Sequence, residues 1–342
     1  MFAPLITALQ ASVLLLLALA GDAWLSLRAA RRGRFAGPGA QIRRLIQRLD
    51  RRLNRLDLPD SERFLRGAAL ALILPALAFS LGVLLIGVLA PLRFGWLLEG
   101  LLLAPCLALR QPWERVRQVG HALSRRDLAT ARSEAQPLTF RATAGLDPHA
   151  VARIALEALA KTFHQDLVTP VFWFLLAGLP AVLAWTVLNG IDAIIGHRGP
   201  RHIRFGQGAA VLSSLASRPS AWLAAALLAA AAACLKGTRP RAAWTLACAD
   251  SGQHRSASGG WPEAALAGAL GVSLSGPWLD GGVTVDAPWI GGAGRARIGP
   301  ADIRRALALY GVAGLLLVLL AGLGAGLGAG VWGLCWRLAG LA

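Results

Sequence analysis

Long apolar runs alternate with polar, arginine-rich segments along the chain, and a run of about 20 residues is what a helix needs to cross a bilayer. The pattern predicts an all-α polytopic membrane protein with five or six transmembrane helices, and we expect residues 1–342 to form a single integral membrane domain. The run at 96–109 is short for a crossing, so half of a hairpin or a re-entrant piece is the alternative there. The spans are expected at residues 3–27, 67–90, 96–109, 167–188, 209–235 and 306–335.

The polar segments between the spans carry signals of their own. At residues 42–53, apolar positions recur at helical spacing with arginines on the other face, which is typical of an amphipathic helix. Such a helix lies on anionic lipid or packs as a solvated helix on the protein, and the pattern favours neither. A further helix is expected at 148–161. The Gly-rich stretch 280–292 indicates a small hairpin or loop.

Composition favours a membrane protein over soluble domains. The chain is 56% hydrophobic and 15% charged, whereas a soluble domain has about 25% charged residues. The net charge of +17 comes almost wholly from arginine, and aromatic residues do not alternate with the basic ones as a stacking surface for nucleic acid requires. We therefore expect membrane lipid as a partner, and no nucleic acid.

The basic residues also predict an orientation. Lys and Arg between successive spans number 12, 1, 9, 3 and 8. Since cytoplasmic loops carry an excess of Lys and Arg, the alternation supports six crossings, with 28–66, 110–166 and 236–305 in the cytoplasm. The expected location is the inner (cytoplasmic) membrane.

Residues 163–206 attract attention because an apolar run there is followed at once by Asn189 and Asp192. Their spacing of three puts both side chains on one face of a helical turn, and a polar pair at the end of a span is a site hypothesis. The alternative is a helix cap that leads into a turn. On the six-span map both residues face outward, unless they lie within the bundle or the 167–235 pair enters the membrane without crossing.

Other chemical signals are weaker. The chain has no G-x-x-x-x-G-K-[ST] motif for phosphate, and the glycines at 291–294 favour a turn over an anion-binding nest. His197 and His202 are five residues apart in a loop, a poor spacing for a metal, and are expected at the surface. The carboxylates placed where a magnesium–phosphate site could gather are Glu157, Asp166, Asp192 and Glu263. For two of them another interpretation is open: Glu157 could equally be a solvated helix residue, and Glu263 a charge at a helix N-terminus.

Four motifs, in order and with matching spacing, resemble those of a known family. A family helix that ends A-E-N-x-x-D-G-x-x-x-P-L-F is similar to residues 157–172, and N-T-L-D-S-M-V-G-Y is similar to 189–197. F-G-x-x-x-A-x-x-D-D is similar to 205–214, and S-P-N-A-G-W-P-E-A-A-M-A is similar to 256–267. Over most of its length the chain thus resembles the CobD/CbiB cobalamin-biosynthesis membrane proteins, the adenosylcobinamide-phosphate synthases.

The resemblance implies an ATP-driven amide synthesis, in which a corrinoid carboxylate is activated by phosphoryl transfer and then attacked by aminopropanol or its phosphate. Such chemistry needs Mg²⁺ and positioned cations. A corrinoid and a small amine are the implied substrates, and other cobalamin-pathway proteins or a second copy of the chain the implied protein partners. The implied residues are Asn189, Asp192, Glu157 and Glu263 in catalysis, Arg141, Asp166, Gly260 and Trp261 in cofactor binding, and Asp192 and Asp166 as metal ligands.

Several motif acids of the family are replaced in this chain. Ala142 stands for the acid of R-D-T, Gln165 for that of E-N-x-x-D, and Ser213 and Ser214 for D-D. These losses are expected to weaken the binding of Mg-ATP. The second hypothesis is therefore a catalytically inactive homologue that serves as a binding, assembly or signalling scaffold. A transporter is a weaker third, because no inverted repeat is visible.

Overall fold

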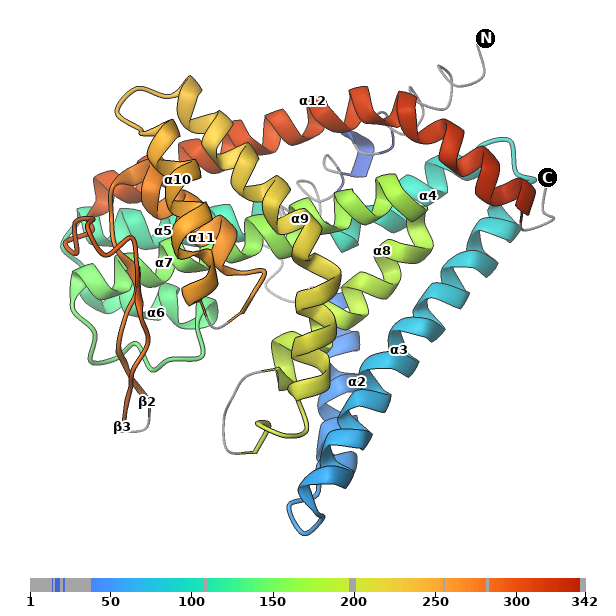
Figure 1. Cartoon of the computed structure of the whole chain (residues 1–342), viewed down its shortest axis with the longest axis horizontal. Coiled ribbons are helices and arrows are strands. Elements are labelled where there is room, and N and C mark those ends of the chain that lie inside the picture. Colours follow the sequence, from blue (N-terminus) through green and yellow to red (C-terminus); the bar gives the residue numbers. More distant parts are fainter. Residues whose placement is uncertain are drawn as a thin grey trace. The chain divides into compact units, whose positions relative to one another are not determined.

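The computed structural model of the protein describes residues 14, 16–18, 21, 38–107, 110–196, 201–254, 256–280 and 283–338 (Figure 1). The predicted first span, 3–27, lies almost wholly outside them. The helices are α2 (Pro38–Leu53), α3 (Asp60–Leu89), α4 (Gly95–Leu103), η1 (Ala104–Cys106), α5 (Arg110–Ser124), α6 (Leu128–Ala135), η2 (Gln136–Leu138), α7 (Pro148–Thr162), η3 (Phe163–Val168), α8 (Thr169–Ile195), α9 (Gln207–Cys234), α10 (Pro240–Asp250), η4 (Ser251–Gln253), α11 (Gly260–Leu270) and α12 (Pro300–Leu338). The strands are β1 (Leu274–Ser275), β2 (Trp278–Asp280), β3 (Val283–Val285) and β4 (Trp289–Ile290).

Within the described residues, four helices are long and apolar enough to cross a membrane. They confirm the all-α membrane class and match the predicted spans 67–90, 167–188, 209–235 and 306–335. The predicted span at 96–109 is not among these four helices. Its helix α4 has nine residues, about 14 Å of length, so it is too short to cross alone and the half-hairpin or re-entrant alternative is favoured. The four helices run over Asp60–Leu89, Pro148–Ile195, Gln207–Cys234 and Pro300–Gly322.

The second of these helices is 48 residues long, roughly 72 Å, which is more than twice the thickness of a hydrocarbon core. It has three parts: α7, the π-helical turn η3 and α8. The apolar run begins only at Leu167. We therefore place the span in α8, and α7, which carries Arg153, Glu157 and Lys161, outside the hydrocarbon.

Helix α8 is itself interrupted near its middle. Ala177 has φ −147° and ψ 20°, and Gly178 has φ 66° and ψ −159°. The second conformation is essentially restricted to glycine. Pro180 follows and has no N–H to donate. The span therefore consists of two shorter helices joined at Ala177–Gly178.

The chain folds into two compact units. Unit 1 comprises residues 1–107, 169–217 and 318–342, and unit 2 comprises residues 108–168 and 218–317. The single membrane domain stays a prediction.

Unit 1 contains α2, α3 and α8, and close backbone contacts fix how they pack. A Cβ on Gly82 of α3 would lie 2.5 Å from the Cα of Pro180 in α8, and a Cβ on Gly67 would meet the carbonyl group of Phe205. Helices α3 and α8 therefore run antiparallel. The loop after α8 reaches the start of α3. This arrangement contradicts the six-span map, which put 28–66 and 189–208 on opposite sides of the membrane.

The amphipathic helix predicted at 42–53 is confirmed as α2. Its Ile46 is fully buried in a cluster with Leu70, Ile191 and Phe205, while most of its arginines are exposed. Gly190 of α8 lies under Ile46 and leaves room for it. The apolar face thus packs on the protein, and the arginine face remains available to anionic lipid.

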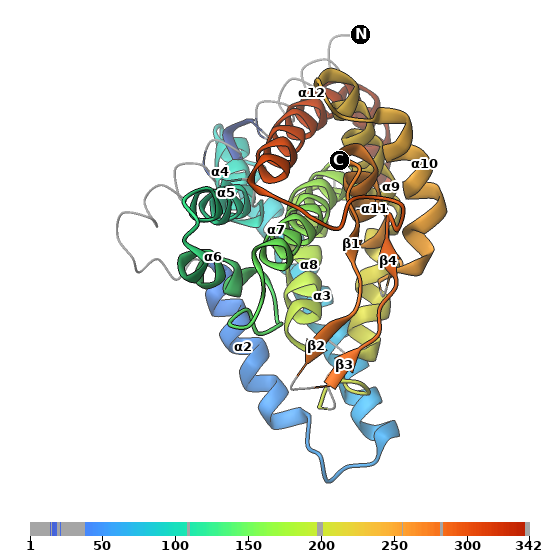
Figure 2. The same cartoon turned by 90° about the vertical axis from the view of Figure 1, so that its left-hand side faces the viewer.

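Unit 2 is built on α7 and α11. The structure confirms the helix predicted at 148–161, which is α7. Helix α11 is buried on nearly every side, with only Trp261 partly exposed. Strands β2 and β3 pair antiparallel as the small hairpin predicted near 280–292, although it begins two residues earlier, and the hairpin extends away from α11 (Figure 2). The glycines at 291–294 form a turn, as expected, in which the Gly291 N–H donates to Asp250 Oδ2 at 2.9 Å.

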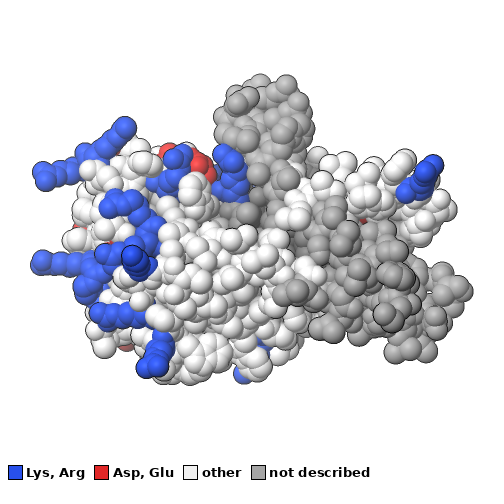
Figure 3. Space-filling model, turned by 90° about the horizontal axis from the view of Figure 1, so that it is seen from above, with Lys and Arg blue, Asp and Glu red and all other residues white. Residues whose placement is uncertain are grey.

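Basic side chains gather on unit 2. Figure 3 shows Lys and Arg at the end of this unit with few acidic side chains among them. Arginines at both ends of the unit's sequence are exposed, among them Arg125, Arg126, Arg297 and Arg304. This surface is open to anionic groups such as lipid headgroups or phosphates.

Candidate functional site

A small cavity in unit 2 collects charged side chains that are far apart in the sequence. Its volume is about 60 Å³. The lining comes from α7, the start of α11 and the segments on either side of the hairpin. Its polar and aromatic lining comprises Arg141, Glu157, Gln253, His254, Glu263, Ser275 and Trp278.

Glu157 enters the cavity from the middle of α7. Its neighbours on this helix are small or aliphatic and buried, among them Leu156 and Ala158, so the carboxylate is carried by a well-packed element. Glu157 Oε2 lies 3.4 Å from a guanidinium nitrogen of Arg141. The side chains are 15% and 23% exposed, which shields this ion pair from most of the solvent screening that weakens surface pairs.

Arg141 sits on a loop that is anchored from both sides. Gln136 donates to the Arg141 carbonyl at 3.1 Å, and the Thr143 hydroxyl donates to the Arg132 carbonyl at 2.9 Å. The Arg141 guanidinium also lies 4.8 Å from the centre of the Trp278 ring, a cation–π distance. The loop therefore holds its cation between a carboxylate and an aromatic face.

Glu263 lies in the first turn of α11, where a negative charge is favoured by the helix dipole. Its side chain is 7% exposed, and Oε2 lies 3.3 Å from His254 Nε2. The expectation of a charge at a helix N-terminus is correct, and this charge is buried. A buried carboxylate needs such partners, because burial without them is costly.

His254 is held by the backbone that follows it. The Ser256 N–H donates to His254 Nδ1 at 2.9 Å, which assigns the proton of the neutral ring to Nε2, toward Glu263. The Ser256 carbonyl lies 3.0 Å from Nδ1 and accepts from the charged ring. Burial by itself lowers the pKa of His254, but the hydrogen bond and the charge of Glu263 outweigh it, so the pKa is raised above its ordinary 6.5.

Ser275 joins the two carboxylates. Its backbone N–H donates to Glu157 Oε1 at 3.0 Å, and its hydroxyl donates to Glu263 Oε1 at 2.6 Å. The residue has φ 57°, a left-handed conformation that is uncommon outside glycine. Strained backbone of this kind is often found where a structure fixes functional groups, and here it directs both donors of one residue at two acids.

The charges of the site limit what it can do. Two carboxylates are set against two permanent cations, Arg141 and Arg153, whose charges both act on Glu157, and against His254, which is positive only when protonated. Such a set can accept and release protons and can hold a cation. The volume is well below the several hundred Å³ of a nucleotide-sized pocket, so neither a nucleotide nor a corrin ring fits inside.

The remaining unit 2 residues of the predicted site have other places. Gly260 is buried, and a Cβ there would lie 2.8 Å from the Cβ of His254, so this glycine lets the histidine approach α11. Trp261 stacks edge-on with Trp222 at 5.8 Å. Asp166 lies in the π-helical turn η3. These three are not among the described residues that line the cavity, and their binding roles stay predictions.

Asn189 and Asp192 belong to unit 1, where both lie in the last turns of α8 and are half-buried. The carboxylate of Asp192 occupies the space that Gly196 leaves open, since a Cβ on this glycine would collide with Oδ1. That contact explains the spacing of the aspartate and the glycine in the motif. The catalytic roles of Asn189 and Asp192 stay predictions.

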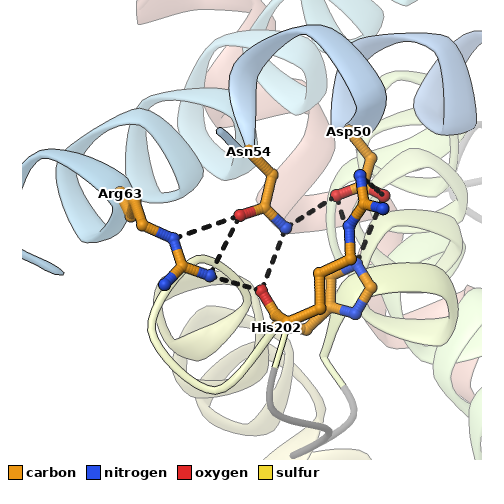
Figure 4. A network of polar contacts seen from close by, with 5 residues as sticks. Asp50, Asn54, Arg63 and His202 are labelled. Atoms are coloured by element: carbon orange, nitrogen blue, oxygen red, sulfur yellow. Dashed lines mark hydrogen bonds and ion pairs between the residues drawn. The ribbon is translucent and has the colours of Figure 1, made fainter. Parts of the chain in front are cut away.

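Unit 1 also contains a polar network that the sequence did not reveal (Figure 4). Asn54 Nδ2 donates to Asp50 Oδ1 at 3.1 Å and to the Arg201 carbonyl at 3.1 Å. Arg63 donates to Asn54 Oδ1 at 3.2 Å and to the same carbonyl at 2.6 Å. His202 Nε2 lies 3.1 Å from Asp50 Oδ1, and its side chain is 11% exposed. The expectation of a surface role was therefore wrong for His202, because Asp50 draws it inward; His197 lies outside the described residues.

No three His, Cys, Asp or Glu side chains gather as a metal-binding group in the described part of the chain. In the cavity, Glu157 and Glu263 are already engaged with Arg141, His254 and Ser275. The donor set thus offers two carboxylates at most, which is too few for a protein cage around Mg²⁺. We derive no step through a metal. Asp166 and Asp192 belong to different units, and their role as ligands stays a prediction.

The sequence missed three of the residues that build the cavity. His254 lies two residues before the fourth motif and nine before Glu263, so the motif pointed to its neighbourhood. Ser275 and Trp278 stand on either side of Gly276 and Pro277, just before the predicted hairpin, and nothing in the local pattern connects them with α7 or α11. The Asp50–Asn54 pair had a signal, because their spacing of four places both on one helix face.

The fold and the cavity define the protein as a polytopic α-helical membrane protein with a shielded acid–base cluster in unit 2. A family model described as "CobD/Cbib protein" matches residues 15–310, so the chain belongs to the CobD/CbiB family, and the resemblance is confirmed. Three relatives are each named "Cobalamin biosynthesis protein CobD". That of Sinorhizobium sp is 42% identical over 265 residues, 76% of this chain and 81% of the relative.

The other two relatives match the chain over a longer stretch. The protein of Rhizobium meliloti (strain 1021) is 39% identical over 279 residues, 81% of this chain and 85% of the relative. The protein of Rhodobacter capsulatus is 37% identical over 291 residues, 84% of this chain and 89% of the relative. No solved structure matches the chain.

Proposed function

We propose that the protein acts in cobalamin biosynthesis as an adenosylcobinamide-phosphate synthase. It joins a corrinoid carboxylate to the amine of aminopropanol or its phosphate at the expense of ATP. The observation that carries the proposal is the convergence of Arg141, Glu157 and Glu263 on one shielded cavity. These residues come from three separate segments that the family motifs single out, and an acid–base reaction needs them together.

The reaction has two steps, each with a requirement that side chains can meet. In the first, an oxygen of the corrinoid carboxylate bonds to the terminal phosphorus of ATP, and ADP leaves with the electron pair of the broken P–O bond. In the second, the amine nitrogen bonds to the carbonyl carbon, the C–O bond to phosphate breaks, and the nitrogen loses a proton. A positioned carboxylate can take that proton, an effect worth about 10²–10⁴ in rate.

The residues of the cavity have different roles in this proton transfer. Glu157 and Glu263 are the proton acceptors, with Arg141 and His254 offsetting their charge when ionised. Ser275 fixes their mutual geometry. Since nucleotide and corrin ring exceed the cavity, both bind outside it, and the exposed basic surface of unit 2 favours the phosphates.

The cellular setting is part of the proposal. The protein lies in the inner membrane in contact with lipid, with the cavity on the cytoplasmic side where ATP is available. Mg²⁺ arrives with the nucleotide rather than in a site of the protein's own. A second copy of the chain and other proteins of the pathway are proposed partners.

A second function is favoured by one observation, the replacement of family acids by Ala142, Gln165, Ser213 and Ser214. With fewer acids to bind Mg-ATP, the chain would keep the membrane scaffold and bind a corrinoid without turnover. The two functions differ in whether product forms.

The test is an assay on the full chain purified in detergent. It is incubated with adenosylcobyric acid, aminopropanol phosphate and Mg-ATP, and the product is followed by mass. We expect an amide product that depends on ATP. Corrinoid binding without product would replace the synthase by the scaffold, and neither binding nor product would reject both.

A further inference from the structure

We propose that the outward face of helix α2 in unit 1 is a binding site for the headgroups of anionic phospholipids. This arginine face consists of five exposed side chains, those of Arg43, Arg44, Arg48, Arg51 and Arg52. Three features carry the proposal: the fixed orientation of the helix, the pairing of the nearby acids with other cations, and the position beside a membrane span. Lipid binding at this face does not depend on amide synthesis.

The orientation of α2 is fixed from its inner side. Ile46 is fully buried in a cluster with Ile191 of α8. Asp50, the acid of this helix, also points inward, where it accepts from Asn54 Nδ2 at 3.1 Å and lies 3.1 Å from His202 Nε2 (Figure 4). Rotation of the helix would expose Ile46 and break these contacts. The arginine face is therefore held outward.

The spacing of the arginines suits phosphate groups. Arg44, Arg48 and Arg51 follow one another at intervals of four and three residues, which places them on one side of the helix with about 5–6 Å between neighbouring Cβ atoms. Each guanidinium presents a planar fork of N–H donors that matches the oxygens of a phosphate. Like charges this close repel one another, and an anion bound between them would offset the repulsion.

The nearby acids do not neutralise the arginine face. Residues 38–66 contain four acidic residues, and each is paired with a cation that does not belong to the face. The pairs are Asp50 with Arg201, Asp57 with Arg55, Asp60 with Arg204 and Glu62 with Arg66. Among the described residues, the five arginines of the face have no ion-pair partner. An anionic ligand would supply the countercharge that they lack there.

The arginine face lies beside the start of a span. Ile46 is buried together with Leu70 and Ala71 of α3, which belong to the apolar run that begins at Gly67. Helix α3 is long and apolar enough to cross a membrane, and its outward side chains suit lipid, with Leu72 58% exposed. The arginines are thus level with the first turns of the apolar run, where headgroups meet hydrocarbon. Basic clusters in this position attract anionic lipids.

The experiment is native mass spectrometry of the full chain in detergent, with phosphatidylglycerol and phosphatidylcholine of identical acyl chains added in equal amounts. Both lipids have a phosphate, but the quaternary ammonium of phosphatidylcholine cancels its charge. We expect phosphatidylglycerol to be retained at least about tenfold more than phosphatidylcholine, and the preference to weaken as salt is raised. Equal retention of the two lipids would overturn the proposal and favour an acidic protein, or solvent, at this face.

Variants then locate the binding. Arg44→Gln combined with Arg48→Gln should lower the preference for phosphatidylglycerol at least about tenfold. The matched control combines Arg125→Gln with Arg297→Gln, which removes two exposed arginines from unit 2 and should leave the preference unchanged. An equal loss in both double variants would mean that net charge, rather than α2, selects the lipid, and would overturn the proposal. If the α2 double variant does not fold, Arg51→Gln alone decides, with an expected loss of about fivefold, and an unchanged preference in it contradicts the site.

Discussion

The polar network of unit 1 and the charged cavity of unit 2 stabilise their buried charges in different ways. In unit 1, Arg63, Asn54 and Asp50 bond to one another and to the loop after α8, so their hydrogen bonds join three chain segments. In unit 2, Glu157 and Glu263 are bridged by Ser275 around a space. The network of unit 1 holds chain segments together, whereas the arrangement in unit 2 leaves room for a ligand.

The comparison teaches that buried charge alone does not identify a functional site. Asp50 and Arg63 are as shielded as Glu263, and Asp50 also lies beside a histidine, His202. Of these two described clusters, the one in unit 2 is the one whose acids line a cavity. If this distinction is right, substitutions in unit 1 should change stability and those in unit 2 should change chemistry.

The largest effect is expected for Arg63→Ala, which should lower the free energy of unfolding by about 3 kcal/mol, because Asn54 and the Arg201 carbonyl lose a buried charged partner. Unfolding in denaturing detergent measures it. Arg66→Ala, one turn further along α3 in an exposed pair with Glu62, is the control and should cost less than about 1 kcal/mol. A stable Arg63→Ala protein with lost turnover would reverse the roles of the two regions.

Glu157→Gln comes next, with an expected loss of about 100-fold in kcat, or about 2.7 kcal/mol in activation free energy. The amide cannot accept the proton, although the shape of the side chain is kept. The amide-forming assay measures the rate, with Glu114→Gln as the control for loss of charge in the same unit. A normal kcat in Glu157→Gln would remove this acid from the reaction.

Gly67→Ala tests the close packing of unit 1 and should cost about 2 kcal/mol of stability. The new methyl group would meet the carbonyl of Phe205, with its carbon at 2.7 Å, and would push the loop after α8 away from α3. Gly87→Ala in the same helix meets nothing within 4 Å and should be neutral or slightly stabilising. Equal melting of the two variants would mean that this contact does not form.

The smallest effect is a pH dependence of stability from His254 and Glu263. The pKa of folded His254 is raised above 6.5, so the pair stabilises the protein fully below about pH 6.5, and this stability is lost as pH rises through the higher folded value. The destabilisation caused by His254→Gln should thus be larger at about pH 6 than at about pH 9. In a Glu263→Gln background the trend should vanish, and a trend that persists there has another source.

The sequence predicted those parts of the fold that local periodicity determines. The apolar runs predicted four spans that the structure confirms. The helical spacing at 42–53 predicted α2, and the Gly-rich stretch near 280 predicted the hairpin. The charge count put 28–66 and the loop after α8 on opposite sides, whereas Gly67 near the start of α3 packs against Phe205 of that loop. Counting charges between spans assumes that every apolar run crosses. The nine-residue α4 breaks that assumption.

The candidate site was predictable only where residues carried a motif. Arg141, Glu157 and Glu263 were found in this way, and they do meet. Ser275 was not found, because its partners lie 118 and 12 residues away in the sequence and only the folded chain brings them together. The network around Asn54 was missed for the same reason, since its second half comes from a loop 147 residues later.

The interruption of α8 at Gly178 has an electrical consequence. Between residues 167 and 191 the chain has no ionisable side chain, but two helix ends meet in the middle of this stretch. Each end leaves backbone groups without helical partners and carries about half an elementary charge, negative where the first part stops and positive where the second begins. Pro180 falls where a missing N–H costs least. An apolar segment thus contains an oriented dipole at mid-depth, produced by one glycine and no charged residue.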